Sequence, residues 1–276
     1  MNFPLLLAPG PLLPGRAELV WSTVFFLASF GYTAFALGTR RQHFSPRLNL
    51  AVVAVGFALQ TWFLCVRGGA LGRCPLTNFF EVVGFLCWAL VFFYLIVGNT
   101  YRLSPLGLLT APLVGALQIF ALTAGLDRAG SHTPRDAVNP WLETHAAFSM
   151  LAFGAFALAG VAGGMYLWQE RQLKTHRVRA IFFQLPPIAD LGRLNARLLV
   201  VGFVLLSVGL VAGVFMGVPN SAPHLVWAVV VWLLYAFLVQ ARWGAWRLGP
   251  RRVATWSVGA FGLSLLTLSG LSFVSA

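Results

Sequence analysis

The sequence contains few charged residues and very few acidic ones. Only 9% of its 276 residues are charged and only seven are Asp or Glu, whereas about a quarter of the residues are charged in soluble domains. Hydrophobic residues make up 59% of the chain. This balance excludes a soluble globular domain, and we expect the chain to fold in lipid.

Cysteines and catalytic motifs are also scarce. The three cysteines, Cys65, Cys74 and Cys87, form no CxxC pair, which argues against a thiol-disulfide relay. Cys65 and Cys74 could form a disulfide, or all three cysteines could be small apolar fillers. No HExxH, P-loop or GxSxG motif is present, and no cluster of Asp and Glu suits a catalytic metal. These absences argue against a hydrolytic enzyme.

Eight hydrophobic runs follow one another along the chain, each of the length that crosses a hydrocarbon core of roughly 30 Å as a helix. They cover residues 17–37, 48–66, 78–97, 106–126, 141–168, 196–218, 224–240 and 253–274. The longest polar stretch, residues 169–195, is too short and too basic to fold independently, and we interpret it as a short cytoplasmic loop. The sequence therefore predicts an all-α polytopic membrane protein, with residues 1–276 forming a single transmembrane domain of eight helices.

The net charge of +12 is explained by topology rather than by nucleic-acid binding. Loops on one side of the predicted membrane hold fourteen of the 19 basic residues: Arg40, Arg41, Arg47, Arg102, Arg171, Lys174, Arg177, Arg179, Arg193, Arg197, Arg242, Arg247, Arg251 and Arg252. The positive-inside rule places this side in the cytoplasm and both termini outside, in a multi-pass protein of the cytoplasmic (inner) membrane. The N-terminus lacks a basic stretch before an apolar core, so we expect no cleaved signal peptide.

Polar residues enter the third predicted helix at its outer end. Asn78 and Glu81 lie three residues apart, on one helical face. Burying Glu81 without a partner would be costly, so Arg73 or Arg135 is expected to pair with it. The same residues also suit an ordinary helix start, with Thr77 or Asn78 as the cap and Glu81 near the N-terminal dipole.

Histidines open the fifth and seventh predicted helices at the same outer side. Trp141 and His145 lie four residues apart, and His145 falls roughly 6 Å below the helix start at about 1.5 Å per residue. Imidazole is the usual axial ligand of haem iron, although a histidine bonded to a neighbouring helix would fit the same pattern. His224 opens the seventh helix with Trp227 on the same face, and it is the natural candidate for a second ligand.

Four segments carry a resemblance to a known family. They are residues 75–81 (PLTNFFE), His145 at the start of the fifth helix, residues 166–174 (YLWQERQLK) and residues 185–191 (LPPIADL). This combination is similar to the CcsA/HemX-type cytochrome c assembly family, whose members are polytopic proteins that handle haem on the outer side of the membrane. The resemblance spans most of the chain.

The chain departs from the haem-delivering members of that family in three places. Those members carry a tryptophan-rich segment ending in Trp-Asp before the seventh helix, where residues 214–223 here read VFMGVPNSAP. They also have histidines near the inner end of the seventh helix and after the eighth, where this chain has Gln240 and Ser272. The sequence therefore resembles a divergent member, closer to the shorter HemX-like branch.

The resemblance implies a cytochrome c biogenesis protein that binds or guides haem at the outer face and catalyses no reaction itself. His145 would be the axial ligand, and Trp141, Trp227 and Glu81 would shape the pocket. Expected partners are the lipid bilayer and other cytochrome c assembly proteins or an apocytochrome. The alternative is a non-haem scaffold or regulatory subunit of the HemX-like kind, acting in haem synthesis or complex assembly. A third hypothesis, a small-solute transporter, is opposed by the uncharged spans.

Overall fold

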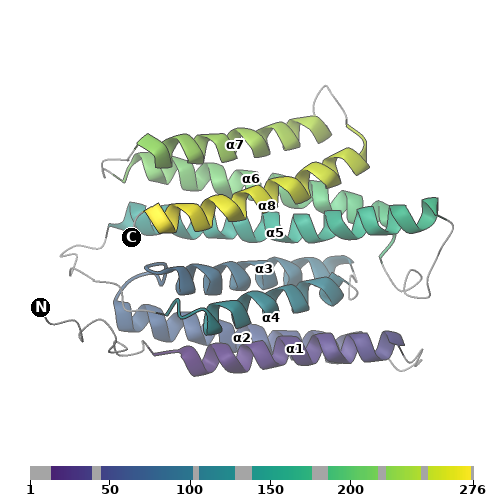
Figure 1. Cartoon of the computed structure of the whole chain (residues 1–276), viewed down its shortest axis with the longest axis horizontal. Coiled ribbons are helices and arrows are strands. Elements are labelled where there is room, and N and C mark those ends of the chain that lie inside the picture. Colours follow the sequence, from purple (N-terminus) through teal and green to yellow (C-terminus); the bar gives the residue numbers. More distant parts are fainter. Residues whose placement is uncertain are drawn as a thin grey trace, which may run out of the picture.

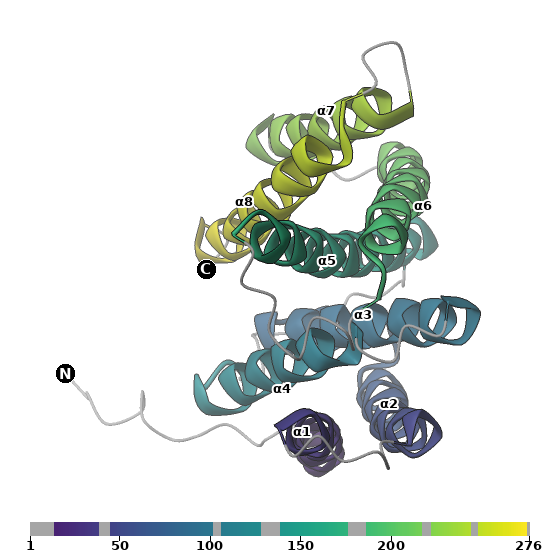
Figure 2. The same cartoon turned by 90° about the vertical axis from the view of Figure 1, so that its right-hand side faces the viewer.

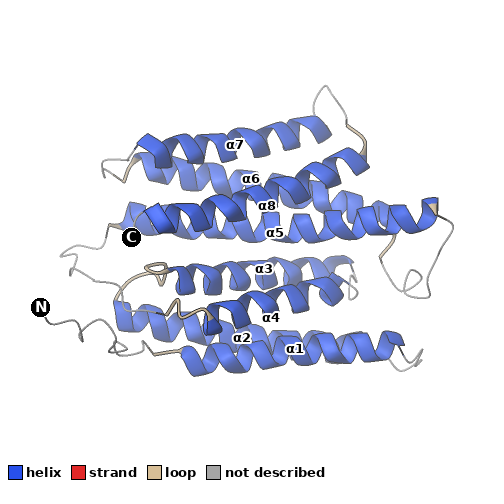
Figure 3. Ribbon diagram, in the orientation of Figure 1, coloured by secondary structure: helices blue, strands red, loops and turns tan. Residues whose placement is uncertain are grey.

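The computed structural model describes residues 14–38, 45–101, 106–127, 139–175, 186–216, 222–243 and 248–274. Within these residues all regular structure is helical, as Figures 1 and 3 show. The helices are α1 (Arg16–Gly38), α2 (Pro46–Leu71), α3 (Phe79–Tyr101), α4 (Gly107–Thr123), α5 (Pro140–Lys174), α6 (Ile188–Val214), α7 (Ala222–Trp243) and α8 (Pro250–Val274). The predicted all-α class is confirmed, and each predicted run corresponds to one helix.

The helices lie side by side and alternate in direction along the long axis of the bundle (Figure 1). We call one end the histidine end: α1, α3, α5 and α7 begin there, and α2, α4, α6 and α8 end there. The opposite end, where α6 and α8 begin, is called the basic end. Six of the described helices are long and apolar enough to cross a membrane, and α4, with 17 residues, is a shorter apolar helix. The chain is therefore a multi-pass membrane protein.

Three helix boundaries differ by five residues or more from the sequence-based prediction. The second helix continues past Val66 to Leu71 and ends at Gly72, whose φ of 63° is the left-handed conformation that suits glycine. The fifth continues to Lys174, supported by a Glu170–Lys174 ion pair of 2.8 Å between residues one turn apart. The sixth begins at Ile188, directly after two prolines that cannot extend a helix backwards. The loop predicted at 169–195 is accordingly shorter at both ends.

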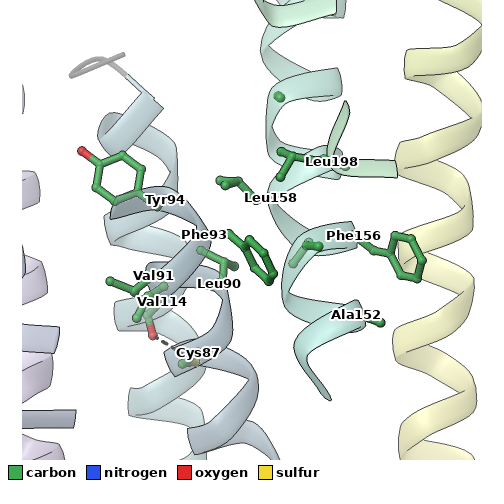
Figure 4. Close-up of a cluster of buried hydrophobic side chains, with 14 of the residues drawn as sticks. Cys87, Leu90, Val91, Phe93, Tyr94, Val114, Ala152, Phe156, Leu158 and Leu198 are labelled. Atoms are coloured by element: carbon green, nitrogen blue, oxygen red, sulfur yellow. Dashed lines mark hydrogen bonds between the residues drawn. The ribbon is translucent and has the colours of Figure 1, made fainter. Parts of the chain in front are cut away.

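The bundle consists of two groups of four helices, α1 to α4 and α5 to α8, which meet where α3 packs on α5 (Figure 2). The two helices approach closely at Gly154 of α5, where an added Cβ would lie 2.5 Å from the Cβ of Ala89. Leu90 and Phe93 of α3 and Leu158 of α5 belong to the same buried cluster (Figure 4). This contact holds the start of α5 beside the loop that connects α2 to α3.

The second group has its own packed centre. The ring of Phe156 on α5 stacks on Tyr235 of α7, with ring centroids 3.4 Å apart, and both side chains are buried. On α6, Gly202 leaves room for the Phe156 ring. These contacts fix α5 against α6 and α7, while α5 also packs on α3 of the first group.

Candidate functional site

His145 lies in the second turn of α5, and the local sequence accounts for its position. Asn139 caps the helix, because its side-chain oxygen accepts a hydrogen bond of 3.1 Å from the Trp141 N–H. Pro140 occupies the first helical position, where its fixed φ is favourable and its missing N–H costs nothing. The helix start is therefore well defined, and His145 faces α6.

The imidazole of His145 is oriented by a backbone carbonyl of α6. Its Nδ1 lies 2.7 Å from the carbonyl oxygen of Gly209. Because a carbonyl oxygen only accepts hydrogen bonds, Nδ1 is assigned as the donor and the neutral ring carries its lone pair on Nε2. The hydrogen bond to a neighbouring helix that was considered as the structural alternative for His145 is thus present. It also leaves Nε2 available to a ligand.

Two glycines on α6 make this contact sterically feasible. A Cβ added to Gly213 would lie 2.9 Å from His145 Nδ1, and one added to Gly209 would lie 2.9 Å from the Ser149 Oγ. Glycines four residues apart allow two membrane helices to approach closely. The GLVAG sequence at 209–213 therefore forms the surface of α6 on which the His145 ring rests.

An aromatic pair lies next to His145 at the histidine end. The rings of Trp141 and Phe215 have centroids 5.1 Å apart and an interplanar angle of 35°, and both side chains are exposed. The side-chain amide of Asn139 donates a hydrogen bond of 2.8 Å to the Met216 carbonyl. Asn139 therefore ties the start of α5 to the end of α6 while it caps α5.

Asn78 and Glu81 form a reciprocal cap at the start of α3. The Asn78 side-chain oxygen accepts from the Glu81 N–H at 2.9 Å, and the Glu81 carboxylate accepts from the Thr77 N–H at 2.7 Å and from the Thr77 hydroxyl at 2.8 Å. Glu81 is fully buried. The predicted capping role is confirmed.

Glu81 has a cationic partner, as predicted, in a residue that the sequence analysis did not name. Arg67 Nη1 lies 3.9 Å from the Glu81 carboxylate. Arg67 also donates two hydrogen bonds to Asp127, of 2.9 and 3.2 Å. Arg135, one of the two expected partners, lies outside the described residues.

The environment of Arg67 makes this an ion network buried within the first four helices. The guanidinium lies over the rings of Phe63 and Phe80, at 5.5 and 5.1 Å from their centroids, and the two rings contact each other edge to face. Arg16 at the start of α1 lies 3.9 Å from Asp127, so two cations face two carboxylates. The network joins α1, α2, α3 and the segment that follows α4, and Glu81 is part of it, whereas His145 faces α6.

A separate contact joins the two groups of helices near the site. The Glu143 carboxylate on α5 accepts a hydrogen bond of 3.1 Å from the Cys74 N–H in the α2–α3 loop. Burial, with smaller contributions from Glu143 and Glu81, raises the pKa of the Cys74 thiol to about 11. Cys74 is therefore protonated near neutral pH and is a poor metal ligand. The thiols of Cys65, Cys74 and Cys87 are all free, so the suggested disulfide does not form.

Two predicted site residues, His224 and Trp227, lie on α7. His224 is the third residue of α7 at the histidine end, but its side chain lies outside the described residues. Trp227 is more than one-third exposed, and no hydrogen bond or ring contact among the described side chains joins it to His145. Instead α7 is attached to α6 through the Trp232 indole, which donates to the Ser207 hydroxyl at 2.9 Å.

The described residues contain no group of three or more His, Cys, Asp or Glu side chains that could hold a bare metal ion. Iron could be held at His145 only if other ligands came with it, as they do in a porphyrin. The arrangement offers one oriented imidazole nitrogen beside exposed aromatic rings, which suits a planar metal-containing group. Asn139, Gly209 and Gly213 were missed from sequence, although the Asn-Pro helix start and the GLVAG spacing were signals for them.

Comparison with known proteins gives a consistent result. Residues 76–276 match the family model described as "Cytochrome C assembly protein". The chain is 27% identical over 274 residues to protein HemX of Brevibacillus brevis, an alignment that covers 93% of this chain and 97% of HemX. It is 24% identical over 290 residues to a cytochrome c biogenesis protein CcsA of Prochlorococcus marinus, covering 91% and 88% of the two chains. With CcsA of Chlamydomonas reinhardtii the identity is 26% over 211 residues, covering 71% of this chain and 57% of the algal protein.

Proposed function

Since this chain belongs to the cytochrome c assembly protein family, we propose that it binds or guides haem at the histidine end, with His145 as an axial ligand. Family membership supports an assembly role. We therefore assign it the function of an assembly factor that holds haem for other proteins. The apocytochrome or other assembly proteins would be its partners.

The observation that carries the proposal is the hydrogen bond from His145 Nδ1 to the Gly209 carbonyl. Metal-binding histidines nearly always donate their second ring N–H to a carbonyl or carboxylate, which fixes the ring and makes the ligating nitrogen more basic. His145 has this arrangement and is only half-buried, so its Nε2 can meet an incoming group. Bound haem would supply the iron that accepts this nitrogen lone pair.

The aromatic side chains would hold the macrocycle. Trp141 and Phe215 together present an exposed apolar wall one turn from His145. We propose that this wall contacts the porphyrin face, because flat aromatic surfaces pack well on aromatic rings. His224, at the start of α7 at the same end, is retained as the candidate second ligand, with Trp227 on the following turn.

Glu81 and Asn78 receive a supporting role in this proposal. Both are occupied in capping α3, and the Glu81 carboxylate faces Arg67. They would hold the α2–α3 loop in place, and this loop reaches α5 through the Glu143–Cys74 hydrogen bond. They would thus shape the mouth beside His145 without contacting haem.

The proposed topology has eight membrane crossings in the cytoplasmic membrane, with both termini and the histidine end outside. The charge distribution supports it, since α5, α6 and α8 carry exposed arginines and a lysine at the basic end. Haem handling would then take place on the outer face. This is the side on which cytochromes c would receive haem under the family resemblance.

An absorption spectrum of detergent-purified protein tests the proposal. Wild-type protein mixed with haem should show a shifted, intensified Soret band, and the variant His145→Ala should lack it. The variant Ser207→Ala, which removes a hydroxyl between α6 and α7, serves as a matched control that should bind haem normally. A wild type that stays colourless with excess haem would contradict haem binding and leave the non-haem scaffold as the function.

A further inference from the structure

The basic end of the second group of helices forms one continuous surface. Arg251 Nε of α8 lies 3.2 Å from the Glu170 carboxylate of α5. A Cβ added to Gly192 of α6 would lie 3.5 Å from both Pro250 of α8 and the Tyr166 ring of α5. The end of α5 and the starts of α6 and α8 are therefore in contact with one another.

This surface, which we call the α5–α8 basic surface, carries an excess of positive charge. Its exposed basic side chains are Arg171, Lys174, Arg193, Arg197, Arg251 and Arg252. Its acidic side chains are Glu170 and Asp190. Glu170 pairs with Lys174 and Arg251, and Asp190 pairs with Arg193.

Two arginines of this surface are not neutralised. Neither Arg171 on α5 nor Arg252 on α8 forms an ion pair within the part of the chain that the structure describes. Like charges gathered on one surface repel each other, so an anion that binds between them lowers the energy of the folded state. The surface therefore favours an anionic partner.

Nearby tryptophans place this surface at the level of lipid headgroups. Trp168 precedes Arg171 by three residues on α5, and Trp256 follows Arg252 by four on α8. Both indoles are exposed, at 36% and 53%. Tryptophan concentrates at the boundary between membrane and water, and one helical turn advances about 5 Å. The arginines thus lie one turn beyond the hydrocarbon boundary, where lipid phosphates are found.

From the excess positive charge of this surface and its position at the level of the lipid headgroups, we propose that the α5–α8 basic surface binds the phosphate headgroups of anionic phospholipids. Arg171 and Arg252 are the principal contacts. A guanidinium group can donate two parallel hydrogen bonds to a phosphate, which a point charge cannot. An acidic protein partner would be expected to use cations that extend into bulk water, more than one helical turn beyond the level of the indoles. The proposal does not depend on haem binding.

Titration of the full-length protein in zwitterionic detergent with short-chain phosphatidylglycerol tests this directly, with tryptophan fluorescence as the readout. The wild type should bind phosphatidylglycerol more tightly than phosphatidylcholine, and high salt should reduce the difference. Affinity for phosphatidylglycerol should fall roughly fivefold for each arginine in Arg171→Gln and Arg252→Gln, which corresponds to about 1 kcal/mol per basic residue. The control Arg47→Gln alters an exposed arginine at the start of α2 and should leave the affinity unchanged.

Further binding experiments distinguish a lipid headgroup from other anionic ligands of this surface. If inorganic phosphate displaced the lipid at equal concentration, the surface would be a free-phosphate site and the lipid proposal would be overturned. Binding of a poly-glutamate peptide in place of phosphatidylglycerol would overturn it in favour of an acidic protein. Equal affinity of wild type and both variants would also contradict it. Arg171→Lys and Arg252→Lys keep the charge and should lose less affinity than the Gln variants. They replace the Gln variants in the titration if those fail to fold.

Discussion

The Nδ1 atom of His145 lies 2.7 Å from the Gly209 carbonyl oxygen, so a side chain of α5 is oriented by the backbone of α6. In the neutral form of the ring, the lone pair is then on the Nε2 atom. This relationship links helix packing to the proposed chemistry, because any change in the approach of α5 to α6 moves the candidate ligand. Substitutions at this contact and around it should therefore have distinct effects.

Replacing Gly213 by alanine should weaken haem binding without unfolding the protein. The added Cβ would lie 2.9 Å from His145 Nδ1, so the ring must shift and its hydrogen bond to Gly209 must lengthen. We expect the affinity for haem, measured by Soret titration, to fall about tenfold, a loss typical of disturbed support around a metal ligand. Gly164→Ala is the control, because nothing lies within 4 Å of its added Cβ. Equal losses in the two variants would count against this prediction.

Two substitutions separate the two structural roles of Asn139. Asn139→Asp keeps an oxygen that caps the Trp141 N–H but removes the donor to the Met216 carbonyl. It should retain thermal stability and lose haem affinity, because the end of α6 is no longer tied to α5. Asn139→Ala also removes the cap and should cost about 1 kcal/mol of stability. The prediction fails if Asn139→Asp binds haem as the wild type does.

Loss of Arg67 should be among the most destabilising single changes in the chain. The variant Arg67→Met removes the buried cation that faces the carboxylates of Glu81 and Asp127, and of the two ion pairs of Asp127 it leaves only the one with Arg16. Breaking a buried ion pair from one side typically costs about 3–5 kcal/mol, and the thermal midpoint in detergent should fall accordingly. Arg193→Gln, which breaks an exposed pair with Asp190, should cost roughly 1 kcal/mol or less. Similar midpoints for the two variants would exclude a stabilising role for the buried network.

Alkylation of Cys74 should depend on pH and on Glu143. Burial and the two nearby carboxylates disfavour the thiolate and raise its pKa to about 11. Because only the thiolate reacts, the rate should rise about tenfold per pH unit below that value. Glu143→Gln keeps an acceptor for the Cys74 N–H and removes the charge, so alkylation at a given pH should be faster. Glu170→Gln, at the basic end, should leave the rate unchanged, and a rate insensitive to Glu143→Gln would refute the assignment.

The position of His145 could be predicted from sequence, whereas its bonding could not. A long apolar run that starts at Asn-Pro fixes where α5 begins, and therefore the turn on which His145 lies. The acceptor, Gly209, is 64 residues away and becomes a neighbour only when α5 packs on α6. The spacing of Gly209 and Gly213 indicated a close helix contact, but not which helix would make it.

At Arg67 the position of the helix end was predicted wrongly. Hydrophobicity ends at Val66, so the prediction ended the second helix there and left Arg67 outside it. In the structure the helix continues to Leu71 because the Arg67 charge is met by Glu81 and by Asp127, which lies 60 residues away. Sequence reasoning correctly required a cation for Glu81 but had no information on the tertiary contact that supplies it. Composition alone therefore misplaces a helix end when a charged residue near that end is buried.

Rescue of a variant that lacks the His145 side chain is the measurement that tests the central claim most directly. His145→Gly should bind haem weakly in detergent, and adding imidazole should restore the Soret band of the wild type, because free imidazole can take the place of the missing side chain. The spectrum should respond to imidazole in this variant and much less in the wild type, whose ligand is already present. If His145→Gly and the wild type bind haem equally well without imidazole, His145 is not the axial ligand and the proposed function is contradicted.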